Sequence, residues 1–130
     1  MNRTALQNYF SMENFAQILL ETQGDIEKHG VDFLVSDKLA FDGILHRVEL
    51  LGEIAKNITE ECKKENPEIS WNDIARTRDL ITHHYHRIDA QVIRKILTDD
   101  LSVLLAHLLI IRQRVFENLN PEDQKDVKKM

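Results

Sequence analysis

Apolar residues recur every three or four positions through most of the chain, the spacing that gathers side chains on one face of an α-helix. The pattern predicts a first helix over residues 4–28 and a short connection over 30–35. A second helix is predicted from a Ser36 cap to about Lys64. The inner faces of these two helices are predicted to hold Tyr9, Met12, Phe15, Ala16, Leu19 and Ile26, and Leu39, Ile44, Val48, Leu51, Ala55, Ile58 and Cys62.

The helical pattern resumes after a polar link over 63–68. A third helix is predicted from Trp71 to near Thr82. Ser70 is a suitable N-cap, and Asp73 stands where the partner residue of a capping box is found. Trp71 is expected to anchor this helix in the core.

A fourth helix is predicted from about Asp89 to Leu119, with a break within 97–101 where Thr and Asp residues could cap a new segment. Residues 108–111 are consecutively apolar, which is more than one neighbouring helix needs. Part of this face is therefore expected to pack against a second copy of the chain. Residues 120–130 are polar and are predicted to form a frayed tail.

Together these segments predict an all-α fold, an antiparallel bundle of four to five helices that dimerises. The chain of 130 residues is long enough for one domain, expected at residues 1–119. Cys62 is the only cysteine, so no internal disulfide can form. With no N-terminal stretch that resembles a signal peptide and no apolar run long enough to span a bilayer, a cytoplasmic protein without a membrane partner is expected.

The net charge of −5, from 17 basic and 22 acidic residues, excludes a uniformly basic nucleic-acid binder. The charge is unevenly distributed, however. The window from Trp71 to Lys95 holds five basic and three acidic residues, and three of the six histidines. The acidic surplus therefore lies elsewhere in the chain.

Arg78 and His83 in this window are residue types that suit phosphodiester chemistry. An Arg guanidinium can hold two phosphate oxygens, and a His imidazole can take or give a proton near neutral pH. The pair could cleave RNA without a metal, with a base assisting attack by the ribose 2′-OH and Arg stabilising the phosphoryl charge. Spacing alone is weak support, because two solvated polar residues five apart are common by chance.

Helix geometry limits how these residues can meet. Arg78 and His83 point about 140° apart on a straight helix, so one site needs the helix to end or bend near Thr82, or a second copy of the chain. We expect the helix to end there. Tyr85, seven residues after Arg78, could stack on a base, donate a hydrogen bond, or pack its ring at the edge of the bundle.

Asp79 and Arg76 are candidates for supporting roles. Asp79 lies four residues before His83 and could orient its ring, or form an ordinary surface pair. Arg76 shares a helical face with His83 and could help to hold phosphate, or be solvated. A metal site is disfavoured, because neighbouring histidines such as His83 and His84 point about 100° apart on a helix and a closed zinc site needs four ligands. No metal or cofactor is expected.

The order of several residues resembles the HepT-type branch of the HEPN superfamily. The segment 47–55, which contains Gly52 and Glu53, is similar to the helix of that branch that carries a Gly-Glu-Ala signature, and the similarity extends from about Leu6 to Leu119. The residues that carry the resemblance in the second half are Pro67, Ile69, Trp71, Ile74, Arg78, His83, Tyr85, Ile88 and Asp89.

The resemblance implies a dimeric helical bundle in which the motifs of both subunits face a shared cleft. It implies a metal-independent ribonuclease toxin, with Arg78 and His83 as the catalytic pair. It also implies an MntA-type nucleotidyltransferase antitoxin that adds AMP to Tyr85. Two positions depart from the usual pattern: Asp79 stands where Asn is usual, and Arg76 stands where a small residue is usual.

These departures leave a second function open. A carboxylate beside an RNA phosphate is unfavourable, so Asp79 is expected to reduce activity or to serve mainly in holding His83. The alternative to a ribonuclease is a non-catalytic helical partner, or substrate-binding subunit, of a minimal nucleotidyltransferase.

Overall fold

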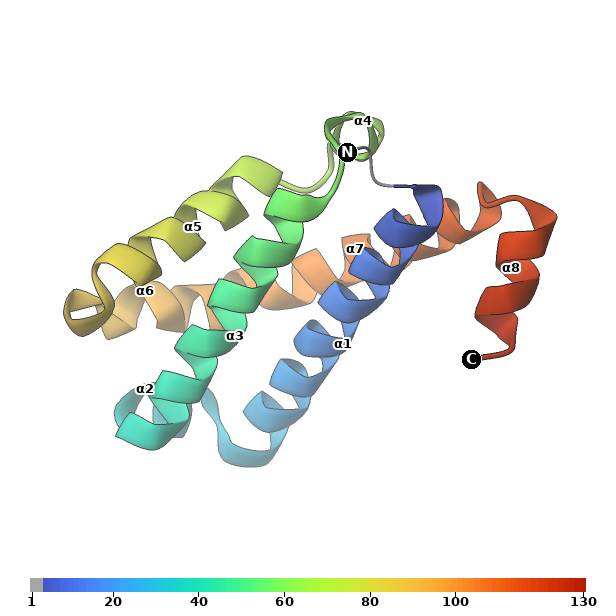
Figure 1. Ribbon diagram of the computed structural model, residues 1–130. Helices are drawn as coiled ribbons and strands as arrows, with labels where there is room; N and C mark the ends of the chain where they lie inside the picture. The colour runs from blue at the N-terminus through green and yellow to red at the C-terminus, as the bar shows by residue number, and fades with distance from the viewer. Residues whose placement is uncertain (1–3) are drawn as a thin grey trace.

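The computed structural model describes residues 4–130, and these residues form helices joined by short links, with no strand among them (Figure 1). The predicted all-α helical bundle is therefore confirmed. The longer helices are α1 (Ala5–His29), α3 (Lys38–Asn57), α5 (Trp71–His83) and α7 (Leu101–Glu117). The shorter elements are α2 (Val31–Ser36), α4 (Glu60–Glu65), the 3₁₀ turn η1 (Tyr85–Arg87), α6 (Ala90–Lys95), the π-helical segment η2 (Ile96–Asp100) and α8 (Pro121–Lys128).

Helix α3 lies between α5 and α1, and α1 packs along α7 (Figure 1). Side chains from all four long helices meet in one core, because each helix turns its apolar stripe inward. The largest side chains that are almost fully buried include Phe15, Met12, Leu19, Leu45, Ile81, Ile93, Leu108 and Ile111. The predicted inner faces of the first two helices are largely confirmed, but Leu39 is wrong: it is 83% exposed, in the first turn of α3.

The first half of the chain contains two more helices than predicted. The expected connection over 30–35 is mostly α2, which begins after Gly30 with a positive φ of 82°. The cap of α3 is Asp37 rather than Ser36, since its side chain accepts a hydrogen bond from the backbone N–H of Ala40. The predicted second helix also ends early: α3 stops at Asn57, and the side chain of Thr59 caps a separate helix, α4.

The C-terminal segment is helical, so the predicted frayed tail is wrong. The side chain of Asn120 caps α8 and Pro121 occupies its first turn, the arrangement that starts a helix well. The side-chain amide of Gln124 lies within hydrogen-bond distance of the carbonyls of Phe116 and Glu117 at the end of α7 and of Leu119 just after it, which ties α8 to the bundle. The domain limits of 1–119 stay a prediction, and residues 1–3 lie outside the described residues.

The long fourth helix is interrupted as predicted, by the π-helical segment η2 rather than by a side-chain cap. After η2, α7 leaves Val103 and Ile110 on the surface, 55% and 59% exposed. Of the helices within residues 4–130, none combines the length and the apolar character needed to cross a lipid bilayer.

Candidate functional site

Trp71 fixes the start of α5, the helix that carries the candidate residues. It is 5% exposed, its ring packs edge-on against Phe15, and its indole N–H donates to the carbonyl of Asn66 at 3.0 Å. The predicted core anchor is confirmed. The predicted capping box is wrong, because Ser70 makes no side-chain capping hydrogen bond and the Asp73 carboxylate pairs with Arg76.

Gly52 allows α5 to approach α3 very closely. A Cβ at this position would lie 2.1 Å from Cβ of Arg78 and 3.1 Å from the carbonyl oxygen of Ile74. No other residue type fits without displacement of Arg78. Gly52 therefore lets the Arg78 side chain lie directly against α3, which explains a glycine in the middle of a long helix.

The guanidinium of Arg78 is held by two carboxylates. Its Nη2 lies 3.3 Å from Oε2 of Glu53 on α3, and its Nη1 donates to Oδ1 of Asp79 at 3.2 Å. Lys56, one turn after Glu53, donates to the same Oδ1. These hydrogen bonds, that from Lys56 first and that from Arg78 second, hold the pKa of the Asp79 carboxyl below its usual range, so it is ionised at neutral pH.

His83 is the last residue of α5 and is exposed to solvent. The helix ends close to the predicted position, but His83 is still helical, so its side chain leaves the axis about 140° from that of Arg78. The sequence suggested that Asp79 could orient the ring of His83. In the structure the Asp79 carboxylate instead accepts hydrogen bonds from Lys56 and Arg78. One chain alone therefore brings Arg78 and Asp79 together but does not add His83 to them.

Tyr85 lies in η1, after the end of α5, and is half-buried against the core. Hydrogen bonding to the Asp42 carboxylate on α3 raises the pKa of the Tyr85 hydroxyl and lowers the pKa of Asp42. Its ring also packs edge-on against His86, with centroids 5.4 Å apart. The hydroxyl of Tyr85 is thus protonated at neutral pH and directed at α3 rather than along α5.

The other polar candidates occupy the outer face of the same region. Arg76 is largely exposed and pairs with Asp73 at 3.4 Å. His83, His84 and His86 are also exposed. Among residues 4–130 no group of three or more His, Cys, Asp or Glu side chains converges as metal ligands do.

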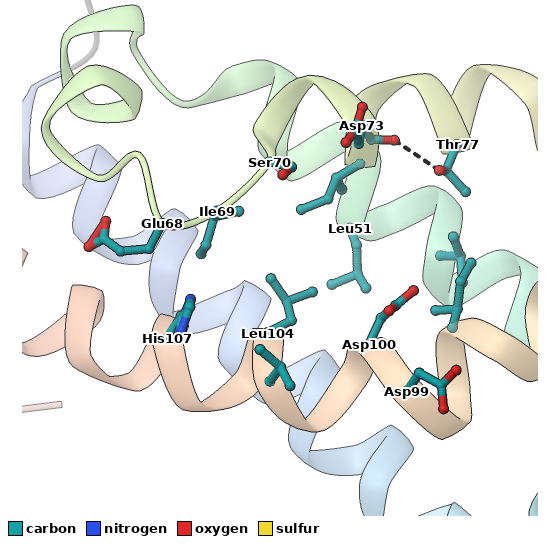
Figure 2. A pocket seen from close by; sticks show the side chains of 14 residues that line it. Leu51, Glu68, Ile69, Ser70, Asp73, Thr77, Asp99, Asp100, Leu104 and His107 are labelled. Carbon is teal, nitrogen blue, oxygen red and sulfur yellow. Dashed lines mark hydrogen bonds between the residues drawn. The ribbon is translucent and has the colours of Figure 1, made fainter.

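A groove of about 420 Å³ lies between the start of α5 and the η2–α7 junction (Figure 2). Its floor is apolar and includes Leu51, Ile69 and Leu104. Four carboxylates and one histidine also line it: Glu68, Asp73, Asp99, Asp100 and His107. Cations outside the groove lining pair with three of these carboxylates. Among the described residues that line the groove there is no lysine or arginine, so the groove offers no fixed cation to a phosphate and is a poor RNA-binding surface.

Sequence reasoning missed three residues that contact the candidates, Glu53, Lys56 and Asp42. All three lie on α3, and their distances from the candidate residues depend on how α3 and α5 pack against each other. For Glu53 a signal existed, since it follows Gly52 in the segment that carries the family resemblance. Lys56 and Asp42 carry no local signal of this kind.

A model of one protein family, described as HepT-like ribonuclease, matches residues 12–111. The match covers most of the chain and includes α3, α5 with Arg78 and His83, and Tyr85 of η1. The chain belongs to the HepT-like ribonuclease family. The resemblance predicted from the sequence is thereby confirmed, and membership of the HepT-like family supports a ribonuclease function.

Individual relatives agree with the HepT-like assignment. The chain is 37% identical over 73 residues to a Thermococcus cleftensis protein that carries the name "Probable ribonuclease HepT"; the match covers 56% of this chain and 66% of that protein, just under two thirds of its length. It is 24% identical over 96 residues to a Methanocaldococcus jannaschii protein named as a candidate RNase, covering 74% of this chain and 76% of the relative. No solved structure gave a significant match.

Proposed function

We propose that this protein is a metal-independent endoribonuclease with Arg78 and His83 as its catalytic residues. The observation that carries the proposal is the HepT-like match across residues 12–111, which contains both residues. The local structure is compatible with it: the side chain of Arg78 is held in place on α5 yet stays 29% exposed, and the imidazole of His83 is open to solvent.

The reaction proposed is attack by a ribose 2′-OH on the adjacent phosphorus. His83 takes the proton of the 2′-OH as the new O–P bond forms. Arg78 donates to the phosphoryl oxygens and stabilises their negative charge. The P–O5′ bond breaks, and the leaving oxygen takes a proton from the imidazolium or from water, which yields a 2′,3′-cyclic phosphate and a free 5′-OH.

A second copy of the chain is part of this proposal. Because Arg78 and His83 diverge on one helix, we infer that Arg78 of one subunit works with His83 of the other in a shared cleft. A dimer also gives a reason for the exposed apolar side chains Val103 and Ile110 on α7.

The test of the reaction is incubation of the purified protein with RNA in the presence of EDTA. Cleavage is expected to persist, because no step needs a metal ion, and the products are expected to carry 2′,3′-cyclic phosphate ends. Mass spectrometry of the fragments identifies those ends. Loss of cleavage on chelation, with recovery on addition of a divalent metal, would contradict the mechanism.

We further propose that the protein is the toxin of a toxin–antitoxin pair and that a nucleotidyltransferase antitoxin adds AMP to Tyr85. Co-expression with such a transferase is expected to raise the mass of the chain by one AMP per modified tyrosine and to reduce RNA cleavage. Tyr85→Phe removes the acceptor oxygen, so its mass should stay unchanged while its ring packing is kept. Tyr9→Phe, in the core, is the matched control and should still gain AMP; an equal gain by Tyr85→Phe would contradict the assignment.

One observation favours the second candidate, a non-catalytic partner of a nucleotidyltransferase. Both outer nitrogens of the Arg78 guanidinium already face carboxylates, those of Glu53 and Asp79. If RNA does not displace these carboxylates from Arg78, the parent protein should leave RNA intact. The His83→Ala protein should then bind a nucleotidyltransferase as well as the parent protein does.

A further inference from the structure

Lys56 on α3 reaches across to α5 and shares a partner with Arg78. Its Nζ and Nη1 of Arg78 both donate to Oδ1 of Asp79, at 2.5 Å and 3.2 Å. One carboxylate oxygen thus holds an ammonium and a guanidinium side by side. Both cations stay accessible, since the side chains of Lys56 and Arg78 are 37% and 29% exposed.

The charge balance around Arg78 depends on Lys56. Glu53 and Asp79 both face the guanidinium, so Arg78 with these two carboxylates alone would present a net negative charge to an approaching phosphate. Lys56 brings the four side chains to neutrality. Asp79 is ionised at neutral pH, which makes the compensation necessary. A phosphate that displaces the Asp79 carboxylate then meets two cations, Lys56 and Arg78, rather than one.

We propose that Lys56 is a second phosphate-binding residue of the RNA site and that Asp79 is the positioning residue that keeps Lys56 beside Arg78. Arg78 contacts the scissile phosphate, and Lys56 contacts the backbone phosphate next to it. The inference rests on the proposed ribonuclease function, which supplies RNA as the ligand. It explains how a carboxylate at position 79 is tolerated beside an RNA backbone.

An exposed Lys–Asp pair can also be a plain surface bridge, which contributes little to stability. In that case Lys56→Ala would leave RNA binding unchanged. The control is Lys125→Ala on α8, which removes the same charge from an exposed lysine on the opposite side of the bundle from α5 (Figure 1). Circular dichroism and thermal melting establish that both variants are folded.

Binding is measured with a fluorescent single-stranded RNA oligonucleotide over a series of salt concentrations, using His83→Ala protein so that the RNA stays intact. Lys56→Ala in this background is expected to weaken binding roughly tenfold at low salt and to lower the slope of log affinity against log salt by about 0.7, the value for one phosphate contact on a single strand. Lys125→Ala should change neither. A Lys56→Ala protein with the parent's affinity and slope would overturn the inference.

Kinetics with His83 present provide a second arm. Lys56→Ala should raise KM for RNA about tenfold with kcat within about threefold, since it removes binding rather than chemistry. The effect should be smaller in an Asp79→Asn background, because the repulsion that Lys56 offsets is gone. A fall in kcat with unchanged KM would count against a binding role. If the parent protein cleaves no RNA, the ribonuclease proposal fails, and the salt-slope experiment still decides the role of Lys56.

Discussion

Replacing His83 with Ala is expected to lower the rate of RNA cleavage by about 10²–10⁴-fold, the usual contribution of a general acid–base residue. His83 is exposed at the end of α5, so its truncation removes no buried contact and should leave the melting temperature nearly unchanged. The measurement is the initial rate of cleavage of an RNA oligonucleotide, with the melting curve recorded on the same sample.

His84→Ala is the matched control, because it changes the same residue type at the next exposed position and should keep the parent rate within about twofold. Arg78→Lys should lose about 10²-fold, because Lys keeps the charge but lacks the planar fork that holds two phosphate oxygens. A His83→Ala protein that cleaves at the parent rate would remove His83 from the mechanism.

Gly52→Ala is expected to destabilise the fold and to reduce cleavage together. The added Cβ would meet Cβ of Arg78 at 2.1 Å and its Cγ at 2.7 Å, so α5 or the arginine must shift. Overpacking costs about 1–3 kcal/mol, and the upper part of this range applies here because the added Cβ meets the Cβ of Arg78 and a backbone oxygen rather than the end of a flexible side chain. Ala gains roughly 1 kcal/mol over Gly within a helix, so the net loss is about 1–2 kcal/mol. A melting temperature lower by about 2–8 °C follows for a domain of this size.

Gly43 provides a control on the same helix. It is exposed, and a Cβ there would meet nothing within 4 Å. Gly43→Ala should therefore stabilise the protein by about 0.5–1 kcal/mol and leave cleavage unchanged. If Gly52→Ala melted at or above the parent temperature with full activity, the close α3–α5 contact would not be what holds Arg78.

The sequence predicted the long helices well because apolar spacing alone determines which faces are buried. It failed where a local signal competed with that spacing. Thr59 starts a new helix in the middle of a continuous apolar stripe. Asn120 and Pro121 start α8 although the residues that follow are polar, and polarity alone predicted a frayed tail there.

For the candidate site, residue types and the end of α5 were predictable, but the partners of Arg78 were not. Glu53 and Lys56 reach Arg78 and Asp79 only because two helices dock at Gly52, and the docking depends on tertiary packing rather than on spacing along one helix. Residue type indicated Arg78 and His83, and helical geometry separates them within one chain.

Mixing two inactive proteins tests the shared site most directly. Arg78→Ala and His83→Ala proteins are combined in equal amounts, allowed to exchange subunits, and assayed with RNA. If one subunit supplies the guanidinium and the other the imidazole, each mixed dimer has one site with both side chains, and about a quarter of the parent rate should return. If the mixture stays as inactive as its components although mass spectrometry detects mixed dimers, the two residues do not act across the subunit boundary.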